Sequence, residues 1–118
     1  MVLADTSVWV AHLRTGAIGL EALLHEGRVV CHPFIAGELA CGNLRKRSEI
    51  LVHLQALPQA IQAENEEVMQ FIENYRLMGK GLGYVDMHLL ASALLTKVPL
   101  WTLDQKLHKV AVKLGLAP

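Results

Sequence analysis

Short apolar segments that alternate with helical patterns constrain the fold of this chain more than any other feature. Residues 1–4 are apolar at every position and stop at Asp5, which is typical of a short parallel strand covered on both faces. Two more brief strands are predicted at 29–31 and 100–102. Strands that alternate with helices indicate a three-layer α/β/α arrangement, in which a short central parallel sheet lies between helices.

Helices are predicted between these strands and after the last of them. Pro33 fits the first position of one helix, which Gly42 ends. The helix expected at 85–95 is apolar on nearly all sides, so it is predicted to be central. The pattern places further helices at 7–13, 20–25, 48–57 and 105–114.

The segment between 58 and 79 carries the clearest amphipathic pattern. A short edge strand is expected at 60–63. Asn65 can cap the helix that follows, and Gly79 is expected to end it. The predicted buried stripe of this helix consists of Val68, Phe71, Ile72 and Tyr75.

The length and the composition are typical of one domain, residues 1–118. Hydrophobic residues make up 53% of the chain, and it has 11 basic and 11 acidic side chains. A chain of this size buries roughly two thirds of its unfolded surface and needs no disulfide. Cys31 and Cys41 lie among apolar neighbours and are interpreted as core residues of a cytoplasmic protein. We expect no membrane span and no secretion signal, because the apolar stretches are short and Asp5 comes early.

The Asp residues fall where parallel α/β sheets bind ligands. Only three of the 11 acidic residues are Asp: Asp5 ends the first strand, Asp104 follows the last strand, and Asp86 opens the central helix. Ligands of such sheets bind at the carboxyl ends of the strands. Helix capping accounts for Asp86 and Asp104 taken singly, so it is their joint placement that indicates a site.

Glu38 is expected to join this group. Its neighbours at helical spacing are Phe34, Ile35 and Cys41, an apolar face that a structural glutamate would avoid. We therefore expect the charge of Glu38 to be at least half-buried and to need compensation. Asp86 shares its own helix face with leucines, which predicts the same for that carboxylate.

Four carboxylates without counter-charge raise one another's pKa, and a divalent cation removes this conflict. Oxygen ligands and retained waters suit Mg²⁺ or Mn²⁺, which can activate a water for hydrolysis of a phosphodiester. Hydroxyls of Thr6, Ser7 and Thr102 can donate hydrogen bonds to these carboxylates, although turn capping explains them equally well. The six histidines show no HxxxH or HxH spacing, so a histidine metal site is not expected.

Two other phosphate-handling folds of similar size fit less well. A phosphoacceptor receiver domain needs an Asp halfway along the chain and paired acids after the first strand, and this chain has neither. A haloacid-dehalogenase-type phosphatase needs a DxD motif, where this chain reads Asp5, Thr6, Ser7.

Four segments resemble, in order and spacing, the PIN-domain ribonucleases of the VapC toxin type. They are LADTSVWV, PFIAGELACGNLRKR, GKGLGYVDMHLLASALL and WTLDQKL, and together they extend over essentially the whole chain. The resemblance implies a PIN-like nuclease that cleaves RNA. After the fourth acid, residues 105–107 stand where family members often have a histidine or an aromatic residue.

The resemblance also implies a metal site, partners and an assembly. The metal, Mg²⁺ or Mn²⁺, would be held by Asp5, Glu38, Asp86 and Asp104. We expect Asp5 and Asp86 to be direct ligands, Glu38 to position a water or bind through one, and Asp104 to complete the site or hold a second metal. The family further implies a toxin role, a VapB-like antitoxin whose C-terminal segment covers the catalytic groove, and a homodimer.

Other side chains have one functional and one structural interpretation. The basic run 45–47, with Arg14, Arg76 and Lys80, can contact RNA phosphates or form a solvated helix end. Trp9 and Trp101 can stack bases, but a core position is favoured. An apolar groove near Trp9, Leu13 and the 48–57 helix is expected to receive the partner's peptide. The alternative function is a non-catalytic PIN-like module that binds RNA or a peptide.

Overall fold

The sheet consists of three short parallel strands with β1 at its centre. In this computed structural model of residues 1–118, β1 spans Val2–Ala4, β2 spans Val29–Val30 and β3 spans Leu100–Trp101. The strand order is β2-β1-β3, and β1 pairs in parallel with both neighbours. The order therefore reverses at β1, which makes the carboxyl end of β1 the place where a sheet of this kind binds ligands.

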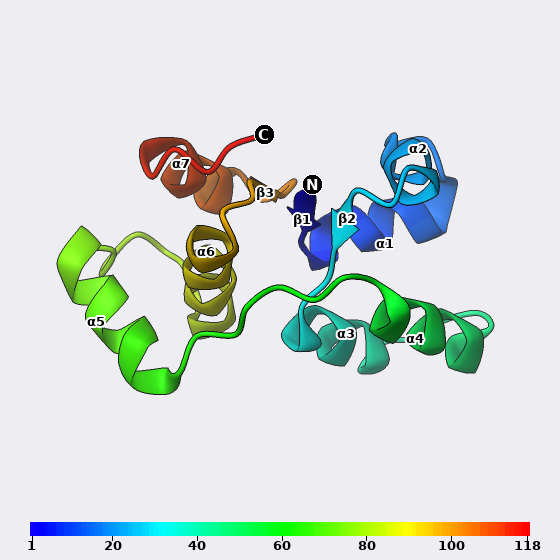
Figure 1. The fold of residues 1–118 in the computed structure, drawn as a ribbon, viewed down its shortest axis with the longest axis horizontal. Coiled ribbons are helices and arrows are strands. Elements are labelled where there is room, and N and C mark those ends of the chain that lie inside the picture. The colour runs from blue at the N-terminus through cyan, green and yellow to red at the C-terminus, as the bar shows by residue number, and fades with distance from the viewer.

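Helices lie on both sides of this sheet. Figure 1 shows α6 and α7 on one side of it and α1 and α2 on the other, with α3 and α4 next to α1 and with α5 next to α6. The expected α/β class with a central parallel sheet is thus confirmed. The helices span Thr6–Thr15 (α1), Leu20–His25 (α2), Pro33–Ala40 (α3), Arg47–Ala56 (α4), Asn65–Tyr75 (α5), Tyr84–Thr96 (α6) and Gln105–Lys113 (α7).

Helix α6 forms the centre of the core, as its apolar sequence predicts. Its residues 87–93 are all buried, and it packs against α5 and β3. Leu89 and Leu90 are almost completely buried, and each stabilises the fold by roughly 1.5–3 kcal/mol. None of the helices combines the length and apolar character that crossing a membrane requires.

The local prediction for 58–79 is wrong in three details. No strand forms at 60–63, because the chain makes only an isolated bridge between Gln59 and Cys31 before it leaves the sheet. Glu64 rather than Asn65 precedes the first turn of α5, and its N–H donates to the Glu67 side chain. The helix ends at Tyr75, before the glycines, because Arg76 adopts a left-handed conformation with φ of 53°.

Two predictions of burial are also wrong. Tyr75 is 48% exposed, because Leu77, just past the left-handed turn, fills the core beside α5 instead. Cys31 is buried as expected, but Cys41 is exposed because it lies at the C-terminal end of α3, where the chain turns outward. Trp9 is buried at 5% exposure, which confirms its predicted core position.

Candidate active site

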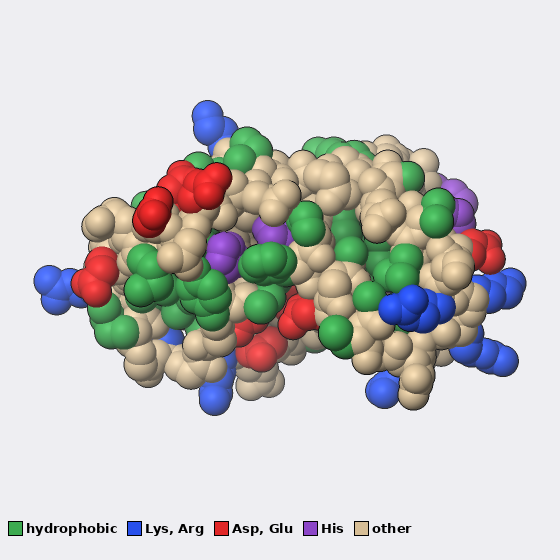
Figure 2. Space-filling model, turned by 90° about the horizontal axis from the view of Figure 1, so that it is seen from below, with side chains coloured by type: hydrophobic (Ala, Val, Ile, Leu, Met, Phe, Trp, Pro, Cys, Tyr) green, Lys and Arg blue, Asp and Glu red, His purple; other side chains and the backbone are tan.

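Four carboxylates surround the carboxyl end of the sheet. Asp5 follows β1 directly, Asp104 follows β3, Glu38 lies on the helix after β2, and Asp86 lies in the first turn of α6. They lie within electrostatic reach of one another, because the charges of the other three each raise the pKa of Asp86. Figure 2 shows acidic side chains near the middle of one face, apart from a second acidic group at one end.

Asp5 is the most firmly held of these carboxylates. It is 6% exposed and caps α1. Its Oδ1 accepts hydrogen bonds from the backbone N–H of Ser7 at 3.0 Å, the N–H of Val8 at 3.4 Å and the Ser7 hydroxyl. Its Oδ2 accepts from the Thr102 hydroxyl at 2.7 Å. Donors on both oxygens fix the orientation of this carboxylate at the end of β1.

Hydroxyl groups link Asp5 to the loop after β3. The Thr102 hydroxyl, which donates to Asp5, also accepts the N–H of Asp104 at 3.0 Å. The Ser7 hydroxyl accepts the N–H of Leu103 at 3.0 Å. These bonds set the position of Asp104 relative to Asp5. The structure thus confirms that Ser7 and Thr102 donate to a carboxylate.

Glu38 lies on α3 and receives a hydrogen bond from the Thr6 hydroxyl at 2.6 Å, as predicted for Thr6. The expectation that its charge would be at least half-buried is wrong, because Glu38 is exposed. Of its apolar neighbours only Ile35 is buried, whereas Phe34 is 37% exposed and Cys41 is exposed. Helical spacing identified the residues on this face correctly, but the face opens to solvent.

Asp86 is half-buried, and its pKa is raised above the usual range of an aspartate. Burial is the largest cause, and the charges of Asp104, Asp5 and Glu38 add to it. A hydrogen bond from the Gly83 N–H, at 3.0 Å, acts in the opposite direction. Asp86 therefore experiences the repulsion expected when carboxylates gather without a cation.

No basic side chain neutralises this group. The two ion pairs of the chain are Glu21–His25 and Glu26–Arg28, both exposed and away from the sheet edge. The helix-capping interpretation and the site interpretation are compatible, because each cap uses one oxygen. Asp104 accepts the Leu107 N–H through Oδ1, and Asp86 accepts the Gly83 N–H through Oδ2.

A free oxygen therefore remains on each of Glu38, Asp86 and Asp104, with no hydrogen bond or ion pair inside the chain. No three His, Cys, Asp or Glu side chains lie close enough together to hold a metal ion in this arrangement. The donor chemistry, which consists only of carboxylate oxygens beside serine and threonine hydroxyls, is that preferred by Mg²⁺ and Mn²⁺. Rotation of exposed side chains would be needed to bring the free oxygens together.

A cluster of aromatic rings and histidines lies where the start of α3 meets α6, and the sequence analysis did not identify it. The His88 ring contacts Phe34 and Tyr84, with centroid distances of 4.8 and 4.6 Å, and Phe34 contacts His32 at 5.1 Å. His32 caps α3 by accepting the Phe34 N–H on Nδ1 at 3.0 Å. Burial, together with the nearby His88, lowers the pKa of His32 to about 4. Two sequence signals were present: His32 lies directly before Pro33, where a helix cap is expected, and Tyr84 and His88 lie at i, i+4 on α6.

Comparisons with known proteins show the family of this chain. A family model described as the PIN domain matches residues 2–113, which include all four carboxylates. The chain is also 40% identical, over 118 residues, to "Ribonuclease VapC32" of Mycobacterium tuberculosis, in strains CDC 1551 / Oshkosh and ATCC 25618 / H37Rv. The match covers 99% of this chain and 95% of each relative. The chain belongs to the VapC-type PIN-domain ribonucleases. In this VapC-type chain the PIN-domain match includes both β1, which Asp5 follows, and the N-terminus of α7, which Asp104 caps.

Proposed function

We propose that this VapC-type chain is an endoribonuclease that depends on Mg²⁺ or Mn²⁺. The observation that carries the proposal is the placement of four carboxylates around the carboxyl end of the sheet, none of which has a basic partner. Such a group is expected to recruit a divalent cation. The printed names of the relatives supply the substrate class, RNA.

The chain's own residues would act in distinct ways. Asp5, Asp86 and Asp104 would hold the metal through carboxylate oxygens, and the fixed orientation of Asp5 would set the position of the others. When bound, the metal lowers the pKa of a water and neutralises charge on the phosphoryl oxygens. Glu38, whose Oε1 is held by Thr6, would orient the attacking water with its free oxygen and accept a proton from it. The water oxygen bonds to phosphorus as the bond to the leaving ribose oxygen breaks.

The test is cleavage of RNA by the antitoxin-free chain in Mn²⁺, with and without EDTA. We expect cleavage that EDTA stops and added Mn²⁺ restores. Asp5→Asn and Asp86→Asn should each abolish cleavage, whereas Glu73→Gln, which removes an exposed carboxylate of α5, should not. Binding of RNA without cleavage of any RNA tested would favour the alternative, a non-catalytic binding module.

We also propose that the chain acts as a toxin restrained by a VapB-like antitoxin. An apolar groove of about 310 Å³ lies between α1 and α4, where the sequence placed the partner's peptide. Its lining includes Trp9, Leu13 and Leu57, together with His12. The Trp9 Nε1 and His12 Nδ1 atoms are buried there without hydrogen-bond partners. A peptide in the groove would cover the apolar lining.

A pair of variants tests this partner surface. Leu13→Glu places a charge in the groove at a residue that is 38% exposed, and Val52→Glu places one at a 62% exposed residue outside it. We expect Leu13→Glu to weaken binding of the antitoxin that suppresses toxicity in coexpression, and Val52→Glu to leave it unchanged. Equal affinities for both variants would contradict this position of the peptide. The homodimer and the cytoplasmic location remain predictions from the family resemblance, and light scattering of the purified chain tests the first.

A further inference from the structure

Helix α7 and the loop before α6 form a groove whose charged lining is positive throughout. The groove has a volume of about 540 Å³. Lys80 of the loop and Lys106, Lys109 and Lys113 of α7 line it, together with His108 and two valines. The three lysines of α7 are spaced at i, i+3 and i+7, so they form one stripe along the helix. No acidic residue belongs to the lining.

This groove, hereafter the lysine groove, concentrates positive charge in a chain without net charge. The formal net charge is zero, yet four of the six lysines line this single surface. All four are exposed, and neither ion pair of the chain involves them. Like charges held together in this way create a local positive potential that attracts a polyanion.

Both walls of the lysine groove are continuous in the chain with residues of the candidate active site. One wall is α7, whose first turn is capped by Asp104. The other wall is the loop that ends where the Gly83 N–H binds Asp86. The Lys106 side chain connects the two walls, because it packs closely against Gly81 of the loop. Its Cδ lies 3.0 Å from the position at which a Cβ on Gly81 would lie. A chain of phosphates leaving the carboxylates on this side would therefore enter the groove directly.

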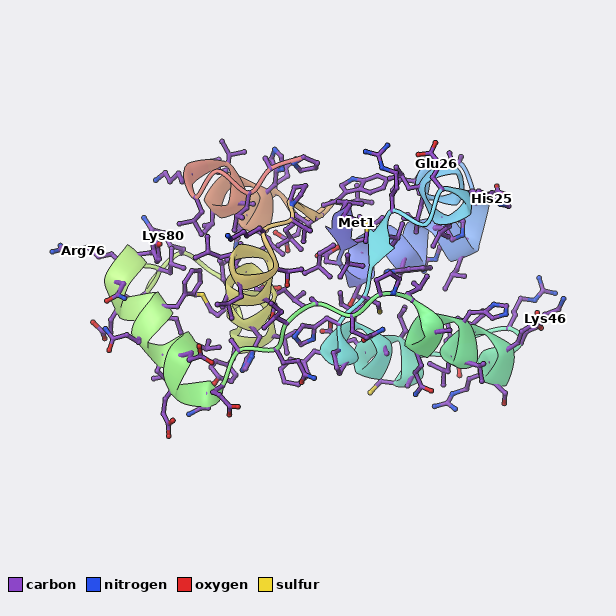
Figure 3. The ribbon with its side chains drawn as sticks, in the orientation of Figure 1. Met1, His25, Glu26, Lys46, Arg76 and Lys80 are labelled. Carbon is purple, nitrogen blue, oxygen red and sulfur yellow. The ribbon has the colours of Figure 1, made fainter.

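The basic run at 45–47 is less well placed for this task. Figure 3 shows Lys46 at the opposite end of the molecule from Lys80. The Arg47 guanidinium donates a hydrogen bond to the Ala40 carbonyl at 2.9 Å, which closes the C-terminal end of α3. That contact supports the structural interpretation of the run as a helix end.

We propose that the lysine groove binds the phosphate backbone of the RNA strand next to the bond that is cut. This inference rests on the proposed ribonuclease function. Lysine ammonium groups bind phosphates as point charges, and contacts to phosphates carry no information about the base sequence. The groove would therefore position the RNA without selecting a particular sequence. From Lys106 to Lys113 the stripe runs about 10 Å along the helix, which is long enough for more than one phosphate.

The experiment measures binding of a fluorescent single-stranded RNA in EDTA as a function of salt, with Asp86→Asn as the background so that no cleavage occurs. The double variant Lys109→Gln, Lys113→Gln removes two lysines of the groove at the end away from the carboxylates. Each phosphate contact contributes about 0.7 to the slope of log affinity against log salt for a single strand, so the slope should flatten by about 1.4. If the two affinities are equal at 1 M salt, the double variant should bind the RNA about 25-fold more weakly than the background at 0.1 M salt.

The matched control is Lys46→Gln, Lys97→Gln, which removes the two lysines outside the groove and changes the net charge equally. Its slope should stay that of the background. The single variant Lys113→Gln should flatten the slope by about half as much as the groove double variant. Equal slopes for the groove and control variants would overturn the inference, even if the unmutated chain cleaves RNA in Mn²⁺. A folded chain that neither binds nor cleaves RNA would overturn the proposed function and the groove together.

Discussion

Acidification should destabilise the fold through one buried ring, His32. Its side chain is completely buried, and its Nδ1 accepts the Phe34 N–H, so the folded protein favours the neutral ring. Burial and the neighbouring His88 lower its pKa from 6.5 to about 4. A group whose pKa is depressed by folding contributes stability that is present above its unfolded pKa and is lost as the pH falls through the folded pKa.

The magnitude follows from these two pKa values. Little is lost above pH 7, because the ring is neutral in both the folded and the unfolded states. By the linkage relation, the free energy of unfolding should fall by about 2 kcal/mol at pH 5 and about 3 kcal/mol at pH 4, from this residue alone. His32 caps α3, which carries Glu38, so its protonation would remove the cap of a helix that contributes to the candidate active site.

The assay is urea unfolding between pH 7.5 and pH 4 on the unmutated chain and two variants. His32→Asn keeps a capping side chain but cannot titrate, so its stability should depend less on pH by about the amounts above. His25→Asn is the control, because the His25 side chain is 77% exposed. An equal loss of stability with falling pH in the unmutated chain and in His32→Asn would show that His32 does not cause the sensitivity to acid.

Two further predictions concern the carboxylates and their hydroxyl partner. Because the pKa of Asp86 is raised, its ionised form opposes folding at pH 7. Asp86→Asn should therefore raise the melting temperature at pH 7, and the gain should vanish near pH 4 if calorimetry is repeated there. Thr102→Val removes the hydroxyl that donates to Asp5 and accepts the Asp104 N–H. It should lower the free energy of unfolding in urea by about 1–3 kcal/mol and should slow RNA cleavage. Thr102→Ser keeps the hydroxyl and should restore both.

The strands, the helices and the region of the site could be predicted because they depend on local patterns. The apolar run that stops at Asp5 gave the central strand, and the uniformly apolar 85–95 segment gave the central helix. Helical spacing shows which residues share a helix face, but it does not show what that face packs against. The predicted burial of Glu38 was therefore too high. The end of α5 was misplaced because Arg76, rather than a glycine, takes the left-handed conformation.

Contacts between distant segments could not be predicted in this way. The stripe of lysines on α7 follows from helical spacing, but its partner Lys80 comes from a loop before another helix. Likewise, the contact of His88 with Phe34 depends on how α3 and α6 meet. These relations belong to the tertiary packing and have no periodic signature in the sequence.

We propose that the four carboxylates share a divalent cation that is used to cut RNA. A direct measurement of Mn²⁺ binding by the chain tests this proposal most closely. Electron paramagnetic resonance of free Mn²⁺ would be followed during titration of the purified chain, with RNA cleavage measured on the same samples. Cleavage should rise with bound Mn²⁺, and Asp86→Asn should lose both while it remains folded. Cleavage at full rate without bound metal, or wild-type Mn²⁺ binding and cleavage by Asp86→Asn, would contradict it.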